Sequence, residues 1–436
     1  MIARRRTASL DREPPGAWSA NGAGDADLIF DLTGSAEPTP GAIVPLYDGA
    51  AGEAARDAAL LDHRAPWVTL AAIIDAAPRA YATALPALPR PDLLCLGRAA
   101  VVEALSALIA RLADCGLAEV SPAPRVVASP AALPLRFAAA TLGGLIERRL
   151  RRLAVSDGHW RVGVRRRAPN ESPFAGLDRL DDPGWRWLAD DRRRYFTDPF
   201  LFEADGAAYV FCEEYPYATG KGVISVFALD EQGNPGPPRV ALERPYHLSY
   251  PLVFRHDGAV WMMPESSSNR TLELYRADPF PFRWTLDRIL VSGVSLADAT
   301  PLIWNGQWWL TAASGATEGS TWDSLALYRG DGPLGPWRRA TDGPALIDAS
   351  TARPAGRVFE HGGALIRPAQ DCRVGYGAGV AFCRVEAIGP NVFRQTPIRR
   401  AVAPLGLHTF NLSERFTAID AAGSRARAAW LEGLAR

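Results

Sequence analysis

Lysine is almost absent from this 436-residue sequence, in which Lys221 is the one lysine beside 47 arginines. Lys221, in the stretch TGKG, is either a functional residue or a residue of an exposed turn. Excess charge is absent too, because 48 basic and 48 acidic residues cancel. This balance gives no reason to predict a nucleic-acid or anionic-membrane partner. The abundance of arginine and alanine is typical of a GC-rich bacterial genome.

Cysteine motifs and long apolar runs are also missing. The five cysteines are an odd number without a CxxC spacing, so neither a zinc site nor a disulfide framework is predicted. Free thiols fit a reducing compartment. The charged N-terminus lacks the apolar core of a secretory signal, and LPLRFAAATLGGLI, interrupted by Arg136, is shorter than the about 20 residues that span a bilayer. We expect a cytoplasmic protein without a transmembrane segment.

Residues 1–155 contain neither a GxGxxG motif nor a P-loop, so no cofactor is predicted there. ADLIFDLTG (26–34) and PDLLCLGRAA (91–100) have the character of buried parallel strands, with Ala-rich helical sequence between them. Residues 132–155 have apolar residues and arginines at helical spacing. We predict a small α/β (Rossmann-like) domain with a connecting helix, whose Arg-rich end is either a solvated face or a contact with an anionic surface.

A repeat runs through the rest of the chain. Proline, an apolar run, a two-residue turn, a second apolar run and polar residues recur in a fixed order. The turns are DG at Asp205 and Asp257, NG at Asn305 and GG at Gly362, a period of about 50 residues. These dipeptides tolerate the positive φ of tight hairpin turns. Each hairpin is followed by two further strand-like runs, and four strands per repeat is typical of a β-propeller blade.

The repeat count is uneven at its two ends. The C-terminal hairpin RFTAIDAAGSRARAAWLE has no outer strands after it, whereas HWRVGVRRR (159–167) and GWRWLADD (184–191) resemble outer strands without a hairpin. Pairing the two would close a ring and remove exposed strand edges. We therefore predict a mainly β protein, a five-bladed β-propeller over residues 156–436. The alternative is a large β-sandwich with coincidental spacing.

Polar residues collect at one end of the predicted hairpins. A hairpin reverses the chain, so the start of its first strand and the end of its second strand lie at the same mouth of a propeller. The residues expected there are Asp198, Glu213, Glu214, His247, Tyr250, Glu265, Asp298, Arg353, Arg367, Gln370, Asp371, His408 and Asn411. Carboxylates mixed with amide, arginine and aromatic side chains suit a carbohydrate ligand. Singly, each acid also has a structural interpretation, since an Asp before Pro often caps a turn.

Several of these stretches resemble a known family. DPFLFEADGAAYVFCEE, KGVISVFALD, PYHLSYPLVFRHDGAVWMMPES and RPAQDCRVGYG are similar to the N-terminal propeller domain of plant glucosamine inositolphosphorylceramide transferases and their bacterial relatives. The resemblance covers roughly residues 156–425. In the plant enzymes the transfer chemistry is assigned to a separate glycosyltransferase domain, of which this sequence shows no counterpart. DLIFDLTG weakly resembles sugar formyltransferases, but the catalytic Asn-His-Asp set is missing, which implies a remnant.

More distantly, the layout is similar to the five-bladed arabinanase, xylosidase and invertase glycosidases. That resemblance implies that Asp198 is a catalytic base and Asp298 a carboxylate that sets a neighbouring pKa. The general acid of those enzymes is a Glu at the head of a later blade, where this sequence has Arg353. Glu265, or else Asp371, would have to replace it, which puts hydrolysis by that mechanism in doubt.

Two functions remain open. The first is a carbohydrate-active enzyme in surface-polysaccharide or glycolipid metabolism, with Asp198, Glu265 and Asp298 catalytic and the arginines suited to a carboxylate or phosphate on the substrate. The second is a glycan-binding module that supports a partner glycosyltransferase. No metal site and no cofactor are predicted from the sequence. The density of acids favours the first and the missing blade-head Glu favours the second.

Overall fold

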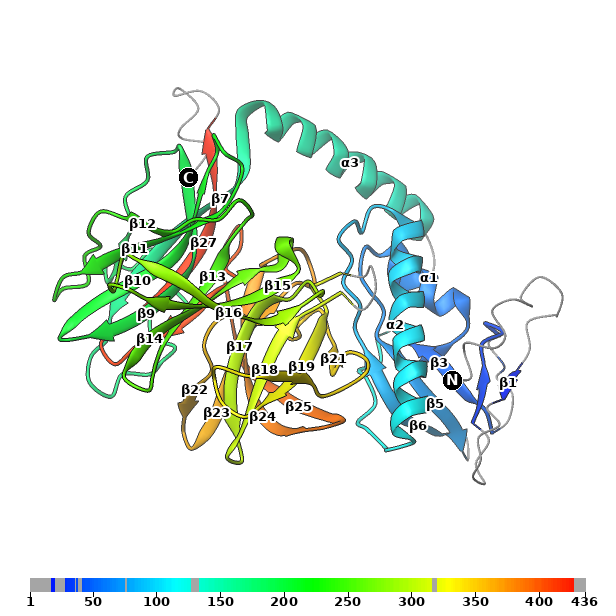
Figure 1. The fold of residues 1–436 in the computed structure, drawn as a ribbon. Helices are drawn as coiled ribbons and strands as arrows, with labels where there is room; N and C mark the ends of the chain where they lie inside the picture. The colour runs from blue at the N-terminus through cyan, green and yellow to red at the C-terminus, as the bar shows by residue number, and fades with distance from the viewer. Residues whose placement is uncertain are drawn as a thin grey trace.

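The computed structural model describes residues 17–19, 28–35, 37, 41–74, 77–126, 133–315 and 320–426. Its described residues form a mainly β protein with two parts joined by the helix α3 (Leu133–Ala154). Figure 1 shows α3 arching from the N-terminal part, on the right, to the first strand of the larger β part, on the left. Among the described residues, no helix combines the length and the apolar character that crossing a membrane requires.

The N-terminal part is a six-stranded sheet with two helices. Its strands are β1 (Ala17–Ser19), β2 (Ile29–Asp31), β3 (Ile43–Tyr47), β4 (Ala50–Ala51), β5 (Val68–Ile74) and β6 (Ala77–Ala84). The strand order is β1-β2-β3-β5-β6, with β4 beside β3. The β2–β3 pair is parallel and the other pairs are antiparallel. A Rossmann-like sheet is therefore not confirmed.

The expected strand over residues 91–100 is wrong, because this segment enters the helix α2 (Leu94–Cys115). Its apolar residues belong to a helical pattern that continues through Val101, Ala104, Leu108 and Leu112, all of them buried. Gly97 lies so close to α1 (Glu53–Leu61) that a Cβ atom there would be 2.9 Å from a methyl group of Leu60. A short apolar run does not by itself distinguish a strand from the first turn of a buried helix.

The described residues from Val155 onward form five antiparallel sheets, numbered here along the chain. Sheet 1 contains β9 (Arg194–Ala204), β10 (Ala207–Pro216), β11 (Val223–Leu229) and β12 (Arg239–Leu242). Sheet 2 contains β13 (Ser249–His256), β14 (Ala259–Ser266), β15 (Thr271–Ala277) and β16 (Trp284–Ser292). Sheet 3 contains β17 (Ala297–Trp304), β18 (Gln307–Ala313), β19 (Ser324–Gly330), β20 (Trp337–Arg339) and β21 (Leu346–Ile347).

The last two sheets complete this part. Sheet 4 contains β22 (Phe359–His361), β23 (Ala364–Asp371), β24 (Gly379–Gly389) and β25 (Val392–Val402). Sheet 5 is composite: it joins β26 (Phe410–Leu412) and β27 (Phe416–Ala426) to β7 (Val155–Arg166) and β8 (Trp185–Trp187). β27 pairs with β7 from Phe416↔Arg166 to Ala426↔Val155.

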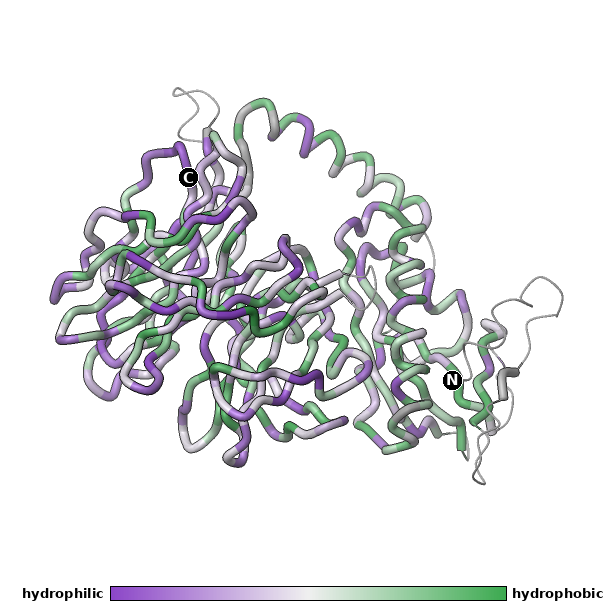
Figure 2. The backbone as a smooth tube through the Cα atoms, viewed as in Figure 1, coloured by the Kyte–Doolittle hydropathy of each residue, from purple (hydrophilic) through white to green (hydrophobic). Residues whose placement is uncertain are grey.

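Hydrophobic clusters join each sheet to the next. Phe211 and Met262 belong to the cluster between sheets 1 and 2, and further clusters lie between sheets 2 and 3, 3 and 4, and 4 and 5. A fifth cluster, which includes Phe416 and Val210, joins sheet 5 back to sheet 1. In Figure 2, hydrophobic residues recur through these sheets and along α2, and also along α3. The packing of the five sheets is therefore cyclic.

The hairpin turns are as the sequence predicts. Positive φ values occur at both turn residues of the inner hairpins of sheets 1 to 4, from Asp205–Gly206 to Gly362–Gly363. Two consecutive residues with positive φ define the turn that matches the twist of paired strands. The predicted turn positions are confirmed.

One of these turns allows a clean test of glycine's backbone role. Gly306 has φ 74°, and no atom lies within 4 Å of the place that a Cβ atom would take, so Gly306→Ala changes backbone strain alone. We expect it to lower the free energy of unfolding by about 1 kcal/mol, measured by urea denaturation. Gly343→Ala, at a position equally open but without a positive φ, is the control. Equal stability of the two variants would contradict the turn assignment.

The N-terminal part packs against sheet 3. Leu85 forms a parallel bridge with Asp348, and the N–H of Ala87 donates to Oδ2 of Asp323 at 2.6 Å. Arg111 on α2 donates to the carbonyl of Ala345 at 2.7 Å. Burial raises the pKa of Asp323 to about 6. The two parts are thus joined by direct contacts as well as by α3.

Candidate functional site

Four buried carboxyl groups converge on one end of the sheets. Asp198, Glu213, Glu265 and Asp298 lie at the first-strand starts and second-strand ends of the inner hairpins of sheets 1, 2 and 3. Each is at most 8% exposed. They are close enough for the charges of the other three to raise the pKa of Glu213 in addition to burial, which is the largest cause. We call this end of the sheets the acidic end.

A repeated backbone feature positions these residues. Asp198, Tyr250 and Asp298 have φ values of 51°, 45° and 55°, in the left-handed region. Each lies where the register of the inner hairpin shifts, at corresponding places in sheets 1, 2 and 3. Such residues cost about 1–3 kcal/mol each and persist where the surrounding structure holds them. Three consecutive sheets therefore carry the same strained bulge next to the acids.

Asp420 on β27 holds the bulge of sheet 1 in place. Its Oδ2 accepts the hydroxyl of Thr197 at 2.7 Å and the backbone N–H of Asp198 at 2.9 Å. Its Oδ1 accepts the N–H groups of His408 and Thr409 at 3.0 and 2.9 Å. Nδ1 of His408 lies 2.6 Å from Oδ2. Burial would raise the pKa of Asp420, but the charge of His408 and these hydrogen bonds hold it below its usual value.

Asp198, in sheet 1, is the buried carboxyl group next to Asp420. Its Oδ1 accepts the hydroxyl of Thr409 at 2.7 Å and its Oδ2 accepts the N–H of Tyr250, in sheet 2, at 3.2 Å. Nε2 of His408 is 3.9 Å from Oδ1. Burial raises the pKa of Asp198. The charge of His408 lowers this pKa and repulsion from Asp420 raises it, and the net shift is upward. Burial would lower the pKa of His408, but Asp420 raises it above its ordinary value.

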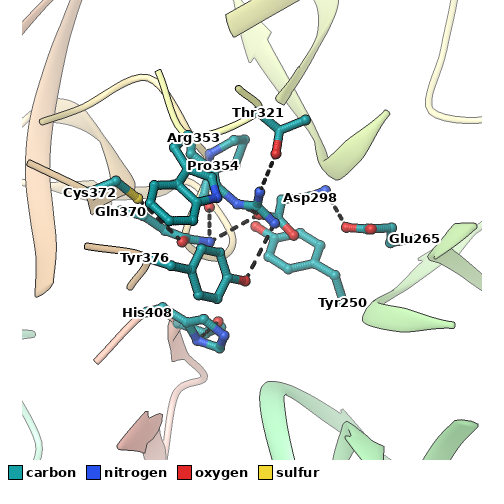
Figure 3. A network of polar contacts seen from close by, with 12 residues as sticks. Tyr250, Glu265, Asp298, Thr321, Arg353, Pro354, Gln370, Cys372, Tyr376 and His408 are labelled. Atoms are coloured by element: carbon teal, nitrogen blue, oxygen red, sulfur yellow. Dashed lines mark hydrogen bonds and ion pairs between the residues drawn. The ribbon is translucent and has the colours of Figure 1, made fainter. Parts of the chain in front are cut away.

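Asp298 and Glu265 continue the chain of contacts into sheets 3 and 4. Glu265 accepts the N–H of Asp298 on Oε2 at 3.0 Å and the hydroxyl of Ser267 on Oε1. Oδ2 of Asp298 receives Nε of Arg353 at 2.7 Å and Nε2 of Gln370 at 3.0 Å. Figure 3 shows Glu265, Asp298, Arg353 and Gln370 linked in this way. Both oxygens of Glu265 are thus engaged by the protein.

Aromatic rings flank the charged network. Arg353 also donates to the hydroxyl of Thr321 at 2.9 Å, and its guanidinium lies 5.0 Å from the ring centroid of Tyr376. Tyr376 meets the ring of His408 edge-on, and Trp160 stacks on that ring with the centroids 4.2 Å apart. Tyr376 is 39% exposed, beside groups that are almost fully buried. Arg353, His408 and Trp322 all contact its ring.

Glu213 differs from the other acids in its partners. Among the described residues, its Oε1 is a buried atom without a hydrogen-bond partner, and Nε2 of His247 lies 3.6 Å from it. Nδ1 of His247 accepts the N–H of Gly222 at 3.0 Å, which assigns the proton of the neutral ring to Nε2. Burial, with repulsion from Asp198 and Glu265, raises the pKa of Glu213 well above its usual range, and burial lowers the pKa of His247. Glu213 is therefore the acid best placed to carry a proton.

Residues 189–408, half of the chain, match the family described as Glucosamine inositolphosphorylceramide transferase 1, N-terminal. The chain belongs to this family. Glucosamine inositolphosphorylceramide transferase 1 of Oryza sativa subsp. japonica is 32% identical over 233 residues, 52% of this chain and 31% of the rice protein. The Arabidopsis thaliana protein of the same name is 30% identical over 208 residues, 47% of this chain and 27% of its own length. The chain thus spans about a third of the length of these relatives.

Solved structures with a low overall similarity include two glycosidases. A β-xylosidase is 13% identical with a TM-score of 0.38, over 46% of this chain and 74% of that chain. A family 117 glycoside hydrolase of Zobellia galactanivorans is 12% identical with a TM-score of 0.39, over 59% of this chain and 89% of that chain. The family relationship predicted from the sequence is confirmed by the plant proteins, and a bacterial origin stays a prediction.

Four of the residues predicted to bind substrate form ion pairs or hydrogen bonds with groups other than the four carboxyl groups of the acidic end. Glu214 accepts from Arg194 and Ser225, each at 2.6 Å, and Asp371 pairs with Arg373 and Arg400. Arg367 donates to the carbonyls of Thr351 and Ala352, and Asn411 donates to the carbonyl of Pro199. Their binding role stays a prediction.

Sequence reasoning missed Asp420, Thr409, Trp160 and Tyr376. A signal for Asp420 was present, since it follows the apolar run FTAI in the second strand of the last hairpin, where Glu213 and Glu265 stand in theirs. Tyr376 and Trp160 lie in a loop and in β7, outside the inner hairpins. No hairpin pattern could have found these two residues.

A metal would have to use the buried group Asp198, His408 and Asp420. Among the described residues, these three offer ligand atoms within 4.8 Å of one another. Asp420, however, already accepts three backbone N–H groups and a hydroxyl through its two oxygens. A cation would have to replace these hydrogen bonds, so the donor set fits a hydrogen-bonded ion pair better than a metal site.

A large cavity is lined by residues of β7, β8 and β27 in sheet 5. Its volume is about 890 Å³, and its lining includes His159, adjacent to Trp160, and Ala421, adjacent to Asp420. Four arginines also line it: Arg151, Arg161, Arg192 and Arg425. His159 bridges the hydroxyl of Tyr217 at 2.7 Å and Asp190 at 2.8 Å. The cavity combines aromatic and cationic groups with one acid, Asp190.

Proposed function

We propose that this protein binds a sugar or glycoconjugate at the acidic end and acts on it chemically. The observation that carries the proposal is the convergence of Asp198, Glu213, Glu265 and Asp298, with the partly exposed residue Tyr376 nearby. Carboxylates and aromatic rings together match the hydroxyl groups and apolar faces of a sugar. Membership of a family named for a glucosamine transferase supports the same class of ligand.

The architecture proposed for this function is a five-bladed β-propeller over residues 156–436, with residues 1–155 as a separate domain. Five sheets and five intersheet clusters, the last between sheets 5 and 1, support it. A β-sandwich would pack two sheets face to face and does not require a cyclic order of contacts. The acidic end would then be one mouth of the ring.

The chemistry assigns opposite roles to Glu213 and Asp198. The proton of Glu213 would pass to the leaving oxygen as that oxygen's bond to the sugar carbon breaks. Asp198 would accept the proton of the water or hydroxyl whose oxygen forms the new bond. Asp298 would orient Arg353, while Glu265 would hold the bulge of sheet 3 through Oε2, which accepts the N–H of Asp298. The arginine-lined cavity would receive an anionic part of the substrate.

A non-catalytic glycan-binding module is the second candidate. The ion pair of Arg353 with Asp298 favours it, because the arginine stands where the glycosidases resembled by the sequence have their general acid. Such a module would serve a partner glycosyltransferase. That partner and the cytoplasmic location stay predictions.

Turnover and binding assays with Asp198→Asn separate the two candidates. The panel contains nucleotide sugars, aryl glycosides and glycolipid headgroups. If the protein is an enzyme, we expect Asp198→Asn to lower turnover by at least about a hundredfold. Glu243→Gln, an exposed acid paired with Lys221, is the surface control. Saturable binding in calorimetry without turnover, with an affinity that Asp198→Asn changes by less than about tenfold, would exclude the enzyme and support the binding module.

A further inference from the structure

The helix α3 exposes an unusual amount of apolar surface. Six large apolar side chains on this one helix have 48–77% of their surface exposed: Leu135, Leu142, Leu145, Ile146, Leu150 and Leu153. Scattered apolar residues on a protein surface are ordinary, but a contiguous group usually marks an interaction site. This group is therefore a candidate contact surface.

The exposed residues form a stripe rather than a random scatter. At 3.6 residues per turn, Leu135, Leu142, Ile146 and Leu153 fall within about 40° of one another around the helix axis. We call these four residues the α3 stripe. Their separations of 7, 11 and 18 residues from Leu135 follow from the sequence. Such a stripe is the apolar face of an amphipathic helix.

The opposite face of α3 already holds the helix to the protein. Phe137 stacks on His63 with ring centroids 4.6 Å apart, and Arg148 pairs with Asp92 at 3.1 Å. Near the other end, Arg151 donates to Ser424 at 2.8 Å. These contacts fix both ends of the helix. The stripe therefore points away from the surface on which α3 is docked.

The charge of α3 is opposite to that of an anionic lipid surface. The helix contains five arginines and one glutamate, Glu147, which gives 5 − 1 = +4 in a chain of zero net charge. Arg149 is exposed beside the stripe and Arg148 is half exposed. Arginine with leucine on one helix is typical of segments that lie in the headgroup region of a membrane. A second copy of this chain would instead bring a second +4 helix to the stripe.

The position of α3 relates this surface to the acidic end. α3 runs directly into β7, whose first residue, Val155, pairs with Ala426 at the end of β27 that lies beyond Asp420. The other end of α3 is attached to the N-terminal part. That part contacts Asp323, which is two residues from Thr321, and Thr321 accepts a hydrogen bond from Arg353. These contacts place both attachments of α3 on the side of the acidic end, and Figure 1 shows α3 arching between the N-terminal part and β7.

We propose that α3 is a membrane-surface helix, which lies in the headgroup region of an anionic bilayer through its stripe and its arginines. The acidic end then faces the lipid surface, where the headgroup of a membrane lipid can reach it. The membrane contact stands on α3 alone and does not depend on whether the acids are catalytic. Its occupant is a lipid surface rather than a protein.

Vesicle binding by the full chain tests the proposal. The probes are phosphatidylcholine vesicles with and without about one third phosphatidylglycerol, and the readout is the partition coefficient from co-sedimentation. We expect binding to the anionic vesicles, weakened at least about tenfold by the triple variant L142E/I146E/L153E. Arg149→Gln should weaken it about fivefold on anionic vesicles. Both variants should keep the circular dichroism and thermal midpoint of the wild type.

A matched control places three glutamates elsewhere. V240E/I289E/V402E changes three residues with 50%, 51% and 67% exposure on the outer strands β12, β16 and β25, and it should bind vesicles as the wild type does. Absence of binding to anionic vesicles, or equal loss in both triple variants, overturns the proposal. A dimer that dissociates in L142E/I146E/L153E, in a protein that does not bind vesicles, overturns it in favour of a second copy.

Discussion

Asp420→Asn is expected to lower the free energy of unfolding by about 3–5 kcal/mol. The substitution keeps the size of the side chain, so no cavity forms, but it removes the buried charge that pairs with His408 at 2.6 Å. It also replaces one acceptor oxygen by a donor next to the N–H groups of Asp198, His408 and Thr409. A buried charge that loses its partner is costly because neither water nor another acceptor replaces it.

The effect should depend on pH in a defined way. The pKa of Asp420 is lowered from 3.8, so its contribution to stability is present above that value and is lost as the pH falls through the folded-state pKa. The pKa of His408 is raised from 6.5, so its contribution is complete below that value and is lost as the pH rises through the folded-state pKa. The loss caused by Asp420→Asn should be largest between about pH 4 and 6.5.

Urea denaturation at several pH values measures this loss. Asp371→Asn is the matched control, because Asp371 is also a buried acid on a second strand, but its partners Arg373 and Arg400 are 49% and 32% exposed. We expect the control to cost about 1 kcal/mol or less. Equal losses in the two variants, or a loss independent of pH, would show that the Asp420–His408 pair does not hold the acidic end together.

Glu213→Gln is expected to abolish turnover while it stabilises the protein. If Glu213 is the proton donor, turnover should fall by about 10²–10⁴-fold, because glutamine has no acidic proton. The stability gain has a separate cause. Burial and the neighbouring acids raise the pKa of Glu213 well above 4.5, so the folded state binds more protons than the unfolded state above that pH. Stability of the wild type is therefore lost as the pH rises from 4.5 toward the folded-state pKa.

The neutral glutamine should remove that loss. Thermal and urea unfolding at neutral pH should show Glu213→Gln more stable than the wild type, with a weaker dependence on pH. Glu214→Gln, one residue along β10, should have the opposite sign, since it removes the charge that pairs with Arg194 at 2.6 Å. A Glu213→Gln protein that retains turnover excludes Glu213 as the donor. A destabilised one would mean that the wild-type carboxylate is ionised and paired.

The turns and the strand repeat were predictable because their signals are local. Asp-Gly, Asn-Gly and Gly-Gly meet the positive φ of a tight turn whatever the surroundings. The strand predicted at residues 91–100 failed for the complementary reason. Its apolar run fits a strand as well as a helix, and the packing of Gly97 against Leu60 lies outside any local window.

The acids were predictable as a group but not one by one. Neighbouring residues on a strand point to opposite faces, so Glu213 and Glu214 cannot both face the centre. The alternation of β10 decides which one does, but residues 210–214 are all buried, so no polar face of this strand marks the inner side in the sequence. For Asp420 the strand was predicted but the role was not. Its role depends on N–H groups of Asp198, His408 and Thr409, which lie on other segments of the chain.

The composite sheet 5 has a consequence for how the chain is made. The edge of β7 is available early in synthesis, yet its partner β27 (Phe416–Ala426) is made only after the strands of sheets 1 to 4. A nascent chain stopped before Phe410 therefore presents an open strand edge on β7. Until β27 has been made and paired, this edge is exposed to chaperones and to pairing with other copies.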